Sequence, residues 1–487
     1  MVKQEFARIE VKAAFFLLIP ILVYILGMSP SLVGGDGDEF LIQAFRCGIG
    51  HPGGRPVYIW IGSLFLIFTN NALYTMNLVS VVFSSFTLVI LYLFMLKLGI
   101  SVRAAIGSVM VYSFVPIILK FSTRSEVYSV NSFFIVLILY LFYAWSKRRD
   151  LRTFLISGFI YGLSLGIHFS NILMLIPLLF FVAMESERRY LKKISLIVLA
   201  IILGAAIPFL YICIRSRVLP AIGTEYNPEN IKNFIIYMTA EKRVMILPTA
   251  PALLKRILFH NFLFVFSFAG IGIFYAFRGF IFELKRKNNF ALLLFFFLCI
   301  NFAFFTYYMS AAYYNKPTLS YIVIAIFMAL GLNKVSTDRL NKIIVPSVVV
   351  FIITFQIMFI LLFSFSVKSS IFKKDTLILG EGRQVLSIAP DNAVIFSSWH
   401  YFPPLLCIQD ILKEGARVNV YEGSLNSRHY RKGDTIETVK CFDYIKNNIN
   451  SGQAIFYYRP SKYVKNYLEK YYRIEEVYKK LFRITIK

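Results

Sequence analysis

Long apolar runs alternate with short polar segments along the chain as far as residue 366. The runs cover residues 13–28, 72–96, 104–119, 127–145, 153–167, 170–184, 194–214, 261–277, 290–308, 317–333 and 343–366. A helix needs roughly 20 apolar residues to cross a bilayer, so the pattern predicts an α-helical polytopic membrane protein with about eleven transmembrane helices. The two short runs on either side of His168 also fit a helical hairpin that does not cross fully.

The pattern changes from about residue 367 to that of a soluble domain. The segments NAVIFSS, ARVNVYEGS, QAIFYYRP and YRIEEVY are typical of strands, and the stretches near 401–413, 437–449 and 460–471 are expected to be helices. Strands that alternate with helices favour an α/β fold. The sequence therefore predicts a transmembrane domain over residues 1–366 and a small α/β domain over residues 367–487.

Composition supports the membrane interpretation. The chain has 487 residues, of which 58% are hydrophobic and only 16% charged, with a formal net charge of +26. Its mean hydropathy is +0.66. The cations fall in short clusters between apolar runs and form no aromatic-interleaved basic face, so we expect contact with anionic lipids and no nucleic-acid partner.

The distribution of Lys and Arg predicts the orientation in the membrane. With a cytoplasmic N-terminus, most cations of the short connecting segments lie inside, and only Arg46, Arg55, Lys120, Arg124 and Lys316 lie outside. The first run lacks an Ala-x-Ala-like cleavage site, so we interpret it as a retained helix. The loops at residues 29–71 and 215–260 and the C-terminal domain are then extracytoplasmic.

Three acids, Asp36, Asp38 and Glu39, follow the first run within four residues. Crowded carboxylates at a membrane boundary have raised pKa values, which suits a general base or a ligand for a divalent cation. A solvated turn is the alternative, which the neighbouring glycines favour on spacing alone. Because no full set of metal ligands is visible, we assign no metal residue and no cofactor, although a divalent cation stays an alternative.

Polar residues recur in the segments expected on the same side. In HPGGRPVY, proline and glycine prevent a regular helix around His51 and Arg55. Such irregular backbone at a membrane surface is typical of a cavity lining, and an arginine there can bind phosphate. Local capping by His51 and snorkelling of single arginines are the alternatives. Further candidates are Arg124, Glu126, His168, Arg215 and Arg243.

The segments GGDGDEF and CGIGHPGGRPVYIWIGSLF, followed by RSEVYSVNSFFIVLILYL, GLSLGIHFSNILMLIPLLF and PFLYICIRSRVLPAI, resemble the DUF2723 family. These membrane proteins are related to protein O-mannosyltransferases. The resemblance extends over roughly residues 14–260, and it is weaker in DNAVIFSSWHYFPPLL. Asp36 and Glu39 match the acids of the family's first motif, and Asp38 stands in place of its glycine. His51 matches the second motif, from which Arg55 departs.

The resemblance implies a glycosyltransferase of the GT-C type. Such an enzyme takes a sugar from a polyprenyl-phosphate donor and transfers it, on the extracytoplasmic face, to an acceptor that is a protein, a lipid or a glycan. An acid of the first loop, Asp36 foremost, is then the general base. The donor's phosphate needs a cationic pocket, for which Arg55, Arg124 and Arg215 are candidates.

Two other classes of protein remain as alternatives. A transporter of lipid-linked saccharides also has many spans, but it needs charges inside them, and these spans contain almost none. A non-catalytic membrane scaffold that presents the C-terminal domain is the second alternative.

Overall fold

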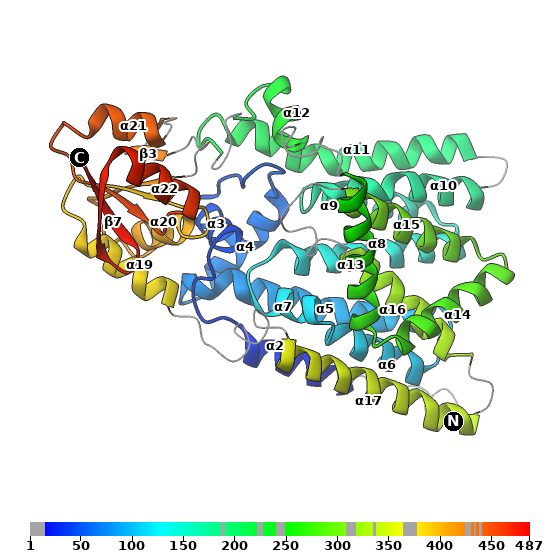
Figure 1. Ribbon diagram of the computed structural model, residues 1–487. Coiled ribbons are helices and arrows are strands. Elements are labelled where there is room, and N and C mark those ends of the chain that lie inside the picture. The colour runs from blue at the N-terminus through cyan, green and yellow to red at the C-terminus, as the bar shows by residue number, and fades with distance from the viewer. Residues whose placement is uncertain are drawn as a thin grey trace.

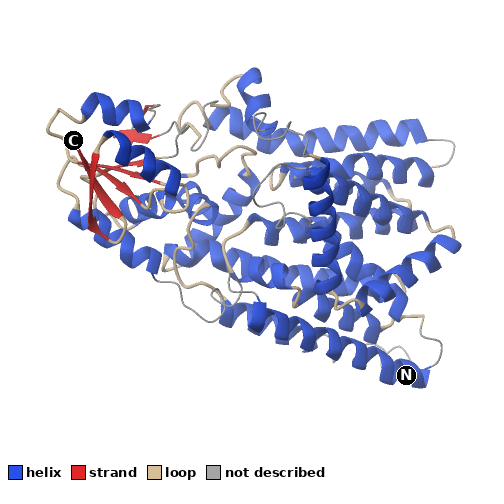
Figure 2. Ribbon diagram, viewed as in Figure 1, coloured by secondary structure: helices blue, strands red, loops and turns tan. Residues whose placement is uncertain are grey.

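The computed structural model describes residues 15–186, 190–221, 227–239, 249–307, 318–334, 338–363, 377–423, 430–432, 435–437 and 441–487. The molecule is elongated, with a bundle of helices at one end and a sheet covered by helices at the other (Figure 1). Every strand that the structure describes belongs to this second end and follows residue 390 (Figure 2).

Five of the described helices are long and apolar enough to cross a membrane, and each overlaps one of the predicted runs. They are α5 (Thr75–Lys97), α8 (Val127–Arg148), α11 (Tyr190–Arg215), α15 (Asn289–Tyr307) and α17 (Asp338–Phe363). Shorter apolar helices accompany them, namely α2 (Leu18–Gly27), α4 (Pro56–Phe68), α9 (Leu151–Ser164), α10 (Leu175–Glu185) and α16 (Thr318–Leu332). The chain is an integral membrane protein, whereas the eleven crossings stay a prediction.

Two predicted runs are bent within the structure. Helices α6 (Val102–Ser113) and α7 (Pro116–Thr123) meet at 71°, because Pro116 cannot continue the hydrogen-bonded turn before it. Helices α13 (Ala250–Ser267) and α14 (Ile271–Lys285) meet at 98°, at a break where Ala269 and Gly270 have positive φ angles. If each bent pair is one span, the number of helices that can cross rises to seven within the described residues.

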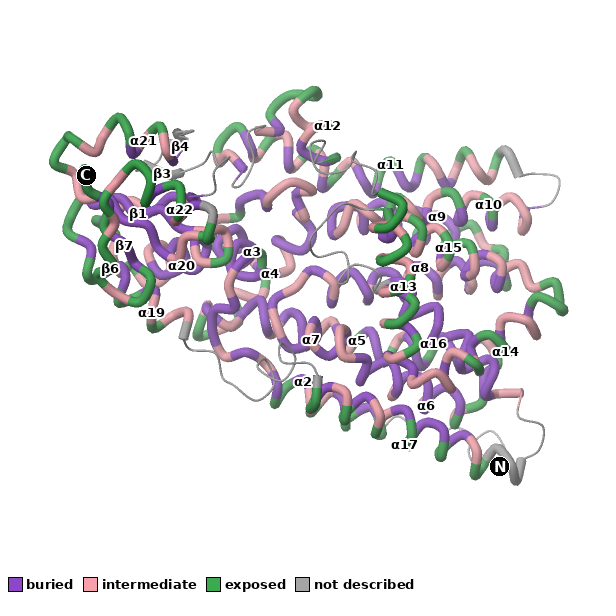
Figure 3. The backbone as a smooth tube through the Cα atoms, in the orientation of Figure 1, coloured by how far each residue is buried: buried purple, intermediate pink, exposed green. Residues whose placement is uncertain are grey.

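Apolar side chains line the outer faces of the bundle. On α17, Val350, Phe351 and Leu362 are exposed, and on α11 Leu210 and Ile214 are exposed. Figure 3 shows exposed positions along both helices and along α13, while α8 and α16 consist mostly of buried positions. Exposed rows of this kind are what a lipid environment requires.

Helices α9 and α11 pack closely through glycines. A Cβ on Gly162 would lie 2.1 Å from the carbonyl oxygen of Ile201, and one on Gly204 would lie 2.1 Å from that of Phe159. Small residues at such contacts let two backbones approach in a membrane. The pair holds the end of α11 beside the first loop.

The segment predicted as one loop, residues 29–71, contains two helices. Helix α3 (Asp36–Arg46) begins at the acids, since carboxylates in the first turn stabilise a helix N-terminus. Helix α4 begins at Pro56, a residue suited to the first helical position. Residues 47–55 between them form no regular element.

The C-terminal sheet has the strand order β4-β3-β2-β1-β5-β7-β6. Its strands are β1 (Val394–Ser397), β2 (Asn419–Glu422), β3 (Tyr430–Lys432), β4 (Thr435–Glu437), β5 (Ile455–Tyr458), β6 (Arg473–Tyr478) and β7 (Leu481–Thr485). Strand β1 pairs in parallel with β2 and β5, with Val394 opposite Asn419 and Ile455. The remaining pairs are antiparallel.

Strands β1, β2, β5 and β6 fall in the four segments predicted as strands. Helices α20 (Phe402–Ile411), α21 (Cys441–Asn448) and α22 (Lys462–Tyr471) fall in the three predicted helical stretches, and α19 (Leu377–Ile388) precedes them. Helix α20 packs against α3, so the C-terminal sheet and the first loop are neighbours (Figure 1). The division into two domains remains a prediction.

Candidate functional site

The three acids predicted from the sequence all lie in the first turn of α3. Gly34 and Gly35 precede them with φ angles of 83° and 61°, a conformation that L side chains rarely adopt. Asp36, Asp38 and Glu39 are therefore close in space, yet each has different partners.

Asp38 is almost fully buried and holds the backbone that leads into α3. Its carboxylate accepts hydrogen bonds from the backbone N–H of Val33 at 2.9 Å and of Gly34 at 2.8 Å. The thiol of Cys407, on α20, lies 3.3 Å from the carbonyl oxygen of Asp38. These contacts give Asp38 a structural position.

Glu39 is fully buried and binds His51 at two points. One carboxylate oxygen accepts the backbone N–H of His51 at 3.0 Å, and the other lies 2.9 Å from ring Nδ1. Burial raises the pKa of the Glu39 carboxyl above its usual range, although the neighbouring His51 acts in the opposite direction. Glu39 therefore orients the imidazole and has no contact with solvent.

Asp36 is the acid that solvent reaches, because half of its side-chain surface is exposed. The indole N–H of Trp399 donates a hydrogen bond of 2.7 Å to Oδ1 of Asp36. Oδ2 lies 3.7 Å from Nε2 of His51. Asp36, His51 and Glu39 thus form a row that runs from the surface into the interior.

The backbone between His51 and Arg55 forms a tight turn. Gly53, Gly54 and Arg55 all have positive φ angles, of 98°, 68° and 51°. Tyr237, on α12 (Ile231–Thr239), fixes the turn: its carbonyl accepts the Gly53 N–H at 3.1 Å, and its hydroxyl donates to the carbonyl of Gly50. A segment far along the chain therefore determines where Arg55 lies.

The guanidinium of Arg55 has more hydrogen-bond donors than the described residues accept. Its guanidinium carbon lies 5.6 Å from the centre of the Phe40 ring, and Nη1 donates to the carbonyl of Pro52 at 3.2 Å. Its Nε is buried and has no hydrogen-bond partner. Among the described residues no carboxylate lies within ion-pair distance of Arg55. Such a guanidinium is suited to bind an anion.

Asn77 connects the polar segment around Ser125 to the backbone that precedes α3. Its side-chain N–H groups donate to the carbonyls of Ser29 and Ser31 at 2.9 Å each, and its oxygen accepts the N–H of Ser125 at 2.7 Å. Arg124 and Glu126 flank Ser125. Arg124 donates at 3.5 Å to the carbonyl of Val33, at the entrance to α3.

Glu126 is partly buried and interacts electrostatically with one acid and three basic side chains nearby. The pKa of Glu126 is raised to about 7, mainly by burial and also by the negative charge of Asp36. Lys120, Arg124 and Arg55 lower it. The candidate site therefore brings together Asp36, Glu39, His51, Arg55, Arg124 and Glu126, all predicted from the sequence.

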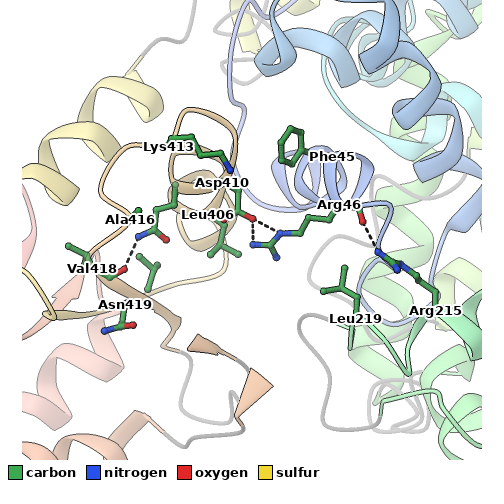
Figure 4. Close-up of a pocket in the computed structure, with 12 residues that line it drawn as sticks. Phe45, Arg46, Arg215, Leu219, Leu406, Asp410, Lys413, Ala416, Val418 and Asn419 are labelled. Atoms are coloured by element: carbon green, nitrogen blue, oxygen red, sulfur yellow. Dashed lines mark hydrogen bonds and ion pairs between the residues drawn. The ribbon is translucent and has the colours of Figure 1, made fainter. Parts of the chain in front are cut away.

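Arg215 lies elsewhere, at the C-terminal end of α3. It donates to the carbonyls of Cys47 at 2.7 Å and Arg46 at 2.9 Å. The eleven residues of α3 place this end about 15 Å from Asp36. A cavity of about 590 Å³ opens here between α3 and the C-terminal sheet, and Arg46 reaches across to Asp410 beside it (Figure 4).

The two remaining predicted residues are His168 and Arg243. His168 precedes a 3₁₀ helix (Phe169–Met174), where its Nδ1 lies 2.6 Å from the hydroxyl of Ser170 and its ring lies 5.5 Å from that of Tyr128. Arg243 falls outside the described residues. Over the described ranges, no group of three His, Cys, Asp or Glu side chains is arranged to hold a metal ion.

Sequence reasoning missed Asn77 and Trp399. A single asparagine inside the apolar run 72–96 is the signal that would have indicated Asn77, because a buried amide needs several partners. Trp399 had a weaker signal, its place just after a predicted strand in SSWHYFPPLL. Only the contact between distant segments reveals its role.

The bundle and the sheet together have a fold similar to that of two solved structures of the GT-C type. ArnT from Cupriavidus metallidurans, solved with bound undecaprenyl phosphate, matches with a TM-score of 0.67 over 97% of each chain at 10% identity. The apo oligosaccharyltransferase of Archaeoglobus fulgidus matches with a TM-score of 0.54 at 14% identity, over 83% of this chain and 64% of that one. At these identities the likeness establishes the fold alone.

Sequence similarity points to a narrower group. Residues 36–191 match the family model described as the protein O-mannosyl-transferase TMEM260 N-terminal domain. The protein O-mannosyl-transferase tmem260 of Dictyostelium discoideum is 23% identical over 241 residues, and that of Mus musculus, TMEM260, is 25% identical over 229 residues. Each match covers 45% of this chain but only 29% and 32% of the relatives' own length.

Proposed function

We propose that the protein is a membrane glycosyltransferase that transfers a sugar from a polyprenyl-phosphate donor to a hydroxyl acceptor, with Asp36 as the general base. One observation carries the proposal: a half-exposed carboxylate and two arginines without a carboxylate partner among the described residues gather around Glu126. A base and a cationic phosphate site side by side are what this reaction needs.

Each group has a task in the proposed transfer. Asp36 takes the proton of the acceptor hydroxyl while the acceptor oxygen bonds to the anomeric carbon. The bond between that carbon and the phosphate oxygen breaks, and its electron pair leaves with the polyprenyl phosphate. Arg55 and Arg124 stabilise the charge that grows on the phosphate. His51, oriented by Glu39, faces the Asp36 carboxylate.

The comparisons support this assignment and suggest the first substrates to test. Both relatives are named protein O-mannosyl-transferases, so we propose mannose as the sugar and a protein hydroxyl as the acceptor. The bound undecaprenyl phosphate of the ArnT structure suggests a polyprenyl phosphate as the carrier. The charge distribution favours an extracytoplasmic site and C-terminal domain.

An assay with labelled polyprenyl-phosphate mannose tests the proposal. We expect label on the acceptor and an equal amount of free polyprenyl phosphate, and a rate roughly 10²–10⁴ lower for Asp36→Asn, the range for loss of a general base. Asp391→Asn, in an exposed ion pair of the C-terminal sheet, is the matched control and should keep the wild-type rate.

Two results would count against the proposal. Wild-type transfer by the Asp36→Asn enzyme would exclude Asp36 as the base. Movement of the intact donor across a vesicle membrane, without release of polyprenyl phosphate, would indicate a transporter.

A further inference from the structure

The loop Ser398–Tyr401 joins the C-terminal sheet to the candidate site. It follows β1, the strand that lies between its parallel neighbours β2 and β5. The chain goes from β1 to β2 on one side and later returns to β5 on the other, so the order reverses at β1. In α/β sheets, ligands bind at the carboxyl ends of the strands at such a reversal.

The sheet holds this loop firmly. The backbone N–H groups of Tyr401 and Phe402 both donate to the carbonyl of Ser398, at 2.9 and 3.0 Å. The Tyr401 ring lies 5.3 Å from that of Tyr458 and 4.7 Å from the guanidinium of Arg459, which is ion-paired. A loop fixed by its own sheet can define the position of a neighbouring group.

The loop docks on the entrance to α3. The carbonyl of His400 accepts the backbone N–H of Gly35 at 2.9 Å. The His400 ring lies so near Gly34 that a Cβ there would be 2.4 Å away. A glycine is therefore required at position 34 both for its positive φ angle and for this contact.

Trp399 completes the contact at the acid itself. Its indole N–H donates to Oδ1 of Asp36 at 2.7 Å, and its ring lies edge-on to His51 with the centroids 5.9 Å apart. The two oxygens of Asp36 thus face different partners, with Oδ1 bonded to Trp399 and Oδ2 near His51. A half-exposed aspartate has several rotamers, and a short hydrogen bond to one oxygen selects among them.

We infer that Trp399 is a positioning residue for Asp36, through which the C-terminal sheet orients the base and keeps it ionised. The inference rests on the proposed role of Asp36. A hydrogen bond to a carboxylate favours its charged form, so loss of the indole N–H should raise the pH at which the base becomes active.

The test is the pH profile of kcat/KM for Trp399→Phe, which keeps an aromatic ring and removes the donor. We expect the acid limb to move up by about one pH unit and kcat at neutral pH to fall about tenfold, since a hydrogen bond to a charged group is of that size. The KM for the donor should stay within about threefold. Trp60→Phe, on α4, is the control and should leave the acid limb unchanged.

A second pair of variants keeps the test decisive if Trp399→Phe does not fold. Trp399→Gln and Trp399→Met have side chains of similar length, and only the first has an N–H donor. We expect the Gln variant to keep an acid limb nearer to wild type than the Met variant. Identical profiles for the two, or an unmoved limb in Trp399→Phe, would overturn the inference. If Asp36→Asn is inactive but the acid limb of Trp399→Phe does not move, the inference about Trp399 fails and the proposed function stands. If Asp36→Asn is fully active, the proposed role of Asp36 fails.

Discussion

The two ends of α3 both contact the C-terminal part of the chain, but they do so with different chemistry. At the C-terminal end, Arg46 pairs with Asp410, and Arg215 donates to the last carbonyls of the helix. At the N-terminal end, Asp36 stays half exposed beside Trp399, and Arg55 has no carboxylate partner within the described chain.

The difference distinguishes charged side chains that stabilise the fold from charged side chains that can bind a ligand. At the C-terminal end of α3, Arg46 is ion-paired with Asp410 and Arg215 is hydrogen-bonded to backbone carbonyls, so we expect both to contribute to stability. Charges at the N-terminal end are incompletely compensated, which costs stability unless a ligand supplies the missing partner. Residue type alone does not distinguish Arg55 from Arg215, since the first follows a glycine-rich segment and the second an apolar one.

The largest expected effect separates Arg55 and Arg124 from Arg215. We expect Arg55→Ala and Arg124→Ala each to lower kcat about 10²–10³-fold, the usual result of removing one group that stabilises transition-state charge. Arg215 contacts the C-terminal end of α3, about 15 Å along the helix from Asp36, so Arg215→Ala should lower kcat by less than about tenfold. Turnover at saturating donor measures this; equal losses in all three variants would contradict the distinction.

The second effect concerns the C-terminal end of α3 and appears in stability. Asp410→Ala removes the ion pair of Arg46 in a partly buried place, and we expect the free energy of unfolding to fall by about 2 kcal/mol. The exposed pair Arg417–Asp391 is the matched control, where Asp391→Ala should cost about 0.5 kcal/mol. Thermal unfolding in detergent compares the two, and similar losses would mean that burial does not strengthen the pair.

The third effect is the pH dependence due to Glu126, which is spread over a range of pH. Its pKa is about 7 in the folded protein against an ordinary value of 4.5, so the folded state binds a proton that the unfolded state releases. Stability therefore falls as the pH rises through this window, with a slope of at most about 1.4 kcal/mol per pH unit.

Glu126→Gln removes the titrating group and should flatten the curve between about pH 5 and pH 7. Glu414→Gln, which alters an exposed ion pair, should leave the slope as it is in the wild type. An unchanged slope in Glu126→Gln would show that Glu126 does not titrate in this range.

Particular residues show how far the sequence could predict the site. The apolar runs predicted the helices, and the acids, His51 and Arg55 lie together because they are close in sequence. Two predictions did not extend to the geometry: the run 104–119 bends at Pro116, and Arg215 lies at the far end of α3. The bend follows from Pro116, which a hydrophobicity pattern does not register, and the position of Arg215 depends on contacts with a distant segment.

The same limit applies to the C-terminal sheet. The four strand-like segments predicted β1, β2, β5 and β6, but β3, β4 and β7 were not predicted, although β7 joins β5 to β6. Strand order arises from pairing between distant segments, and a pattern with a period of two residues specifies only which face is buried.

The sequence by itself determined that this protein lies in a membrane and that its first polar segment carries acids, a histidine and an arginine. Hydrophobic runs and local spacing suffice for that, because burial in lipid acts on each segment separately. Only the tertiary structure decided which acid solvent reaches. Asp38 accepts a hydrogen bond from the backbone N–H of Val33, and Glu39 is buried against His51. Asp36 lies at the surface and accepts a hydrogen bond from Trp399, which follows a strand of the C-terminal sheet. The partners of each carboxylate come from different parts of the chain, and folding alone brings them together.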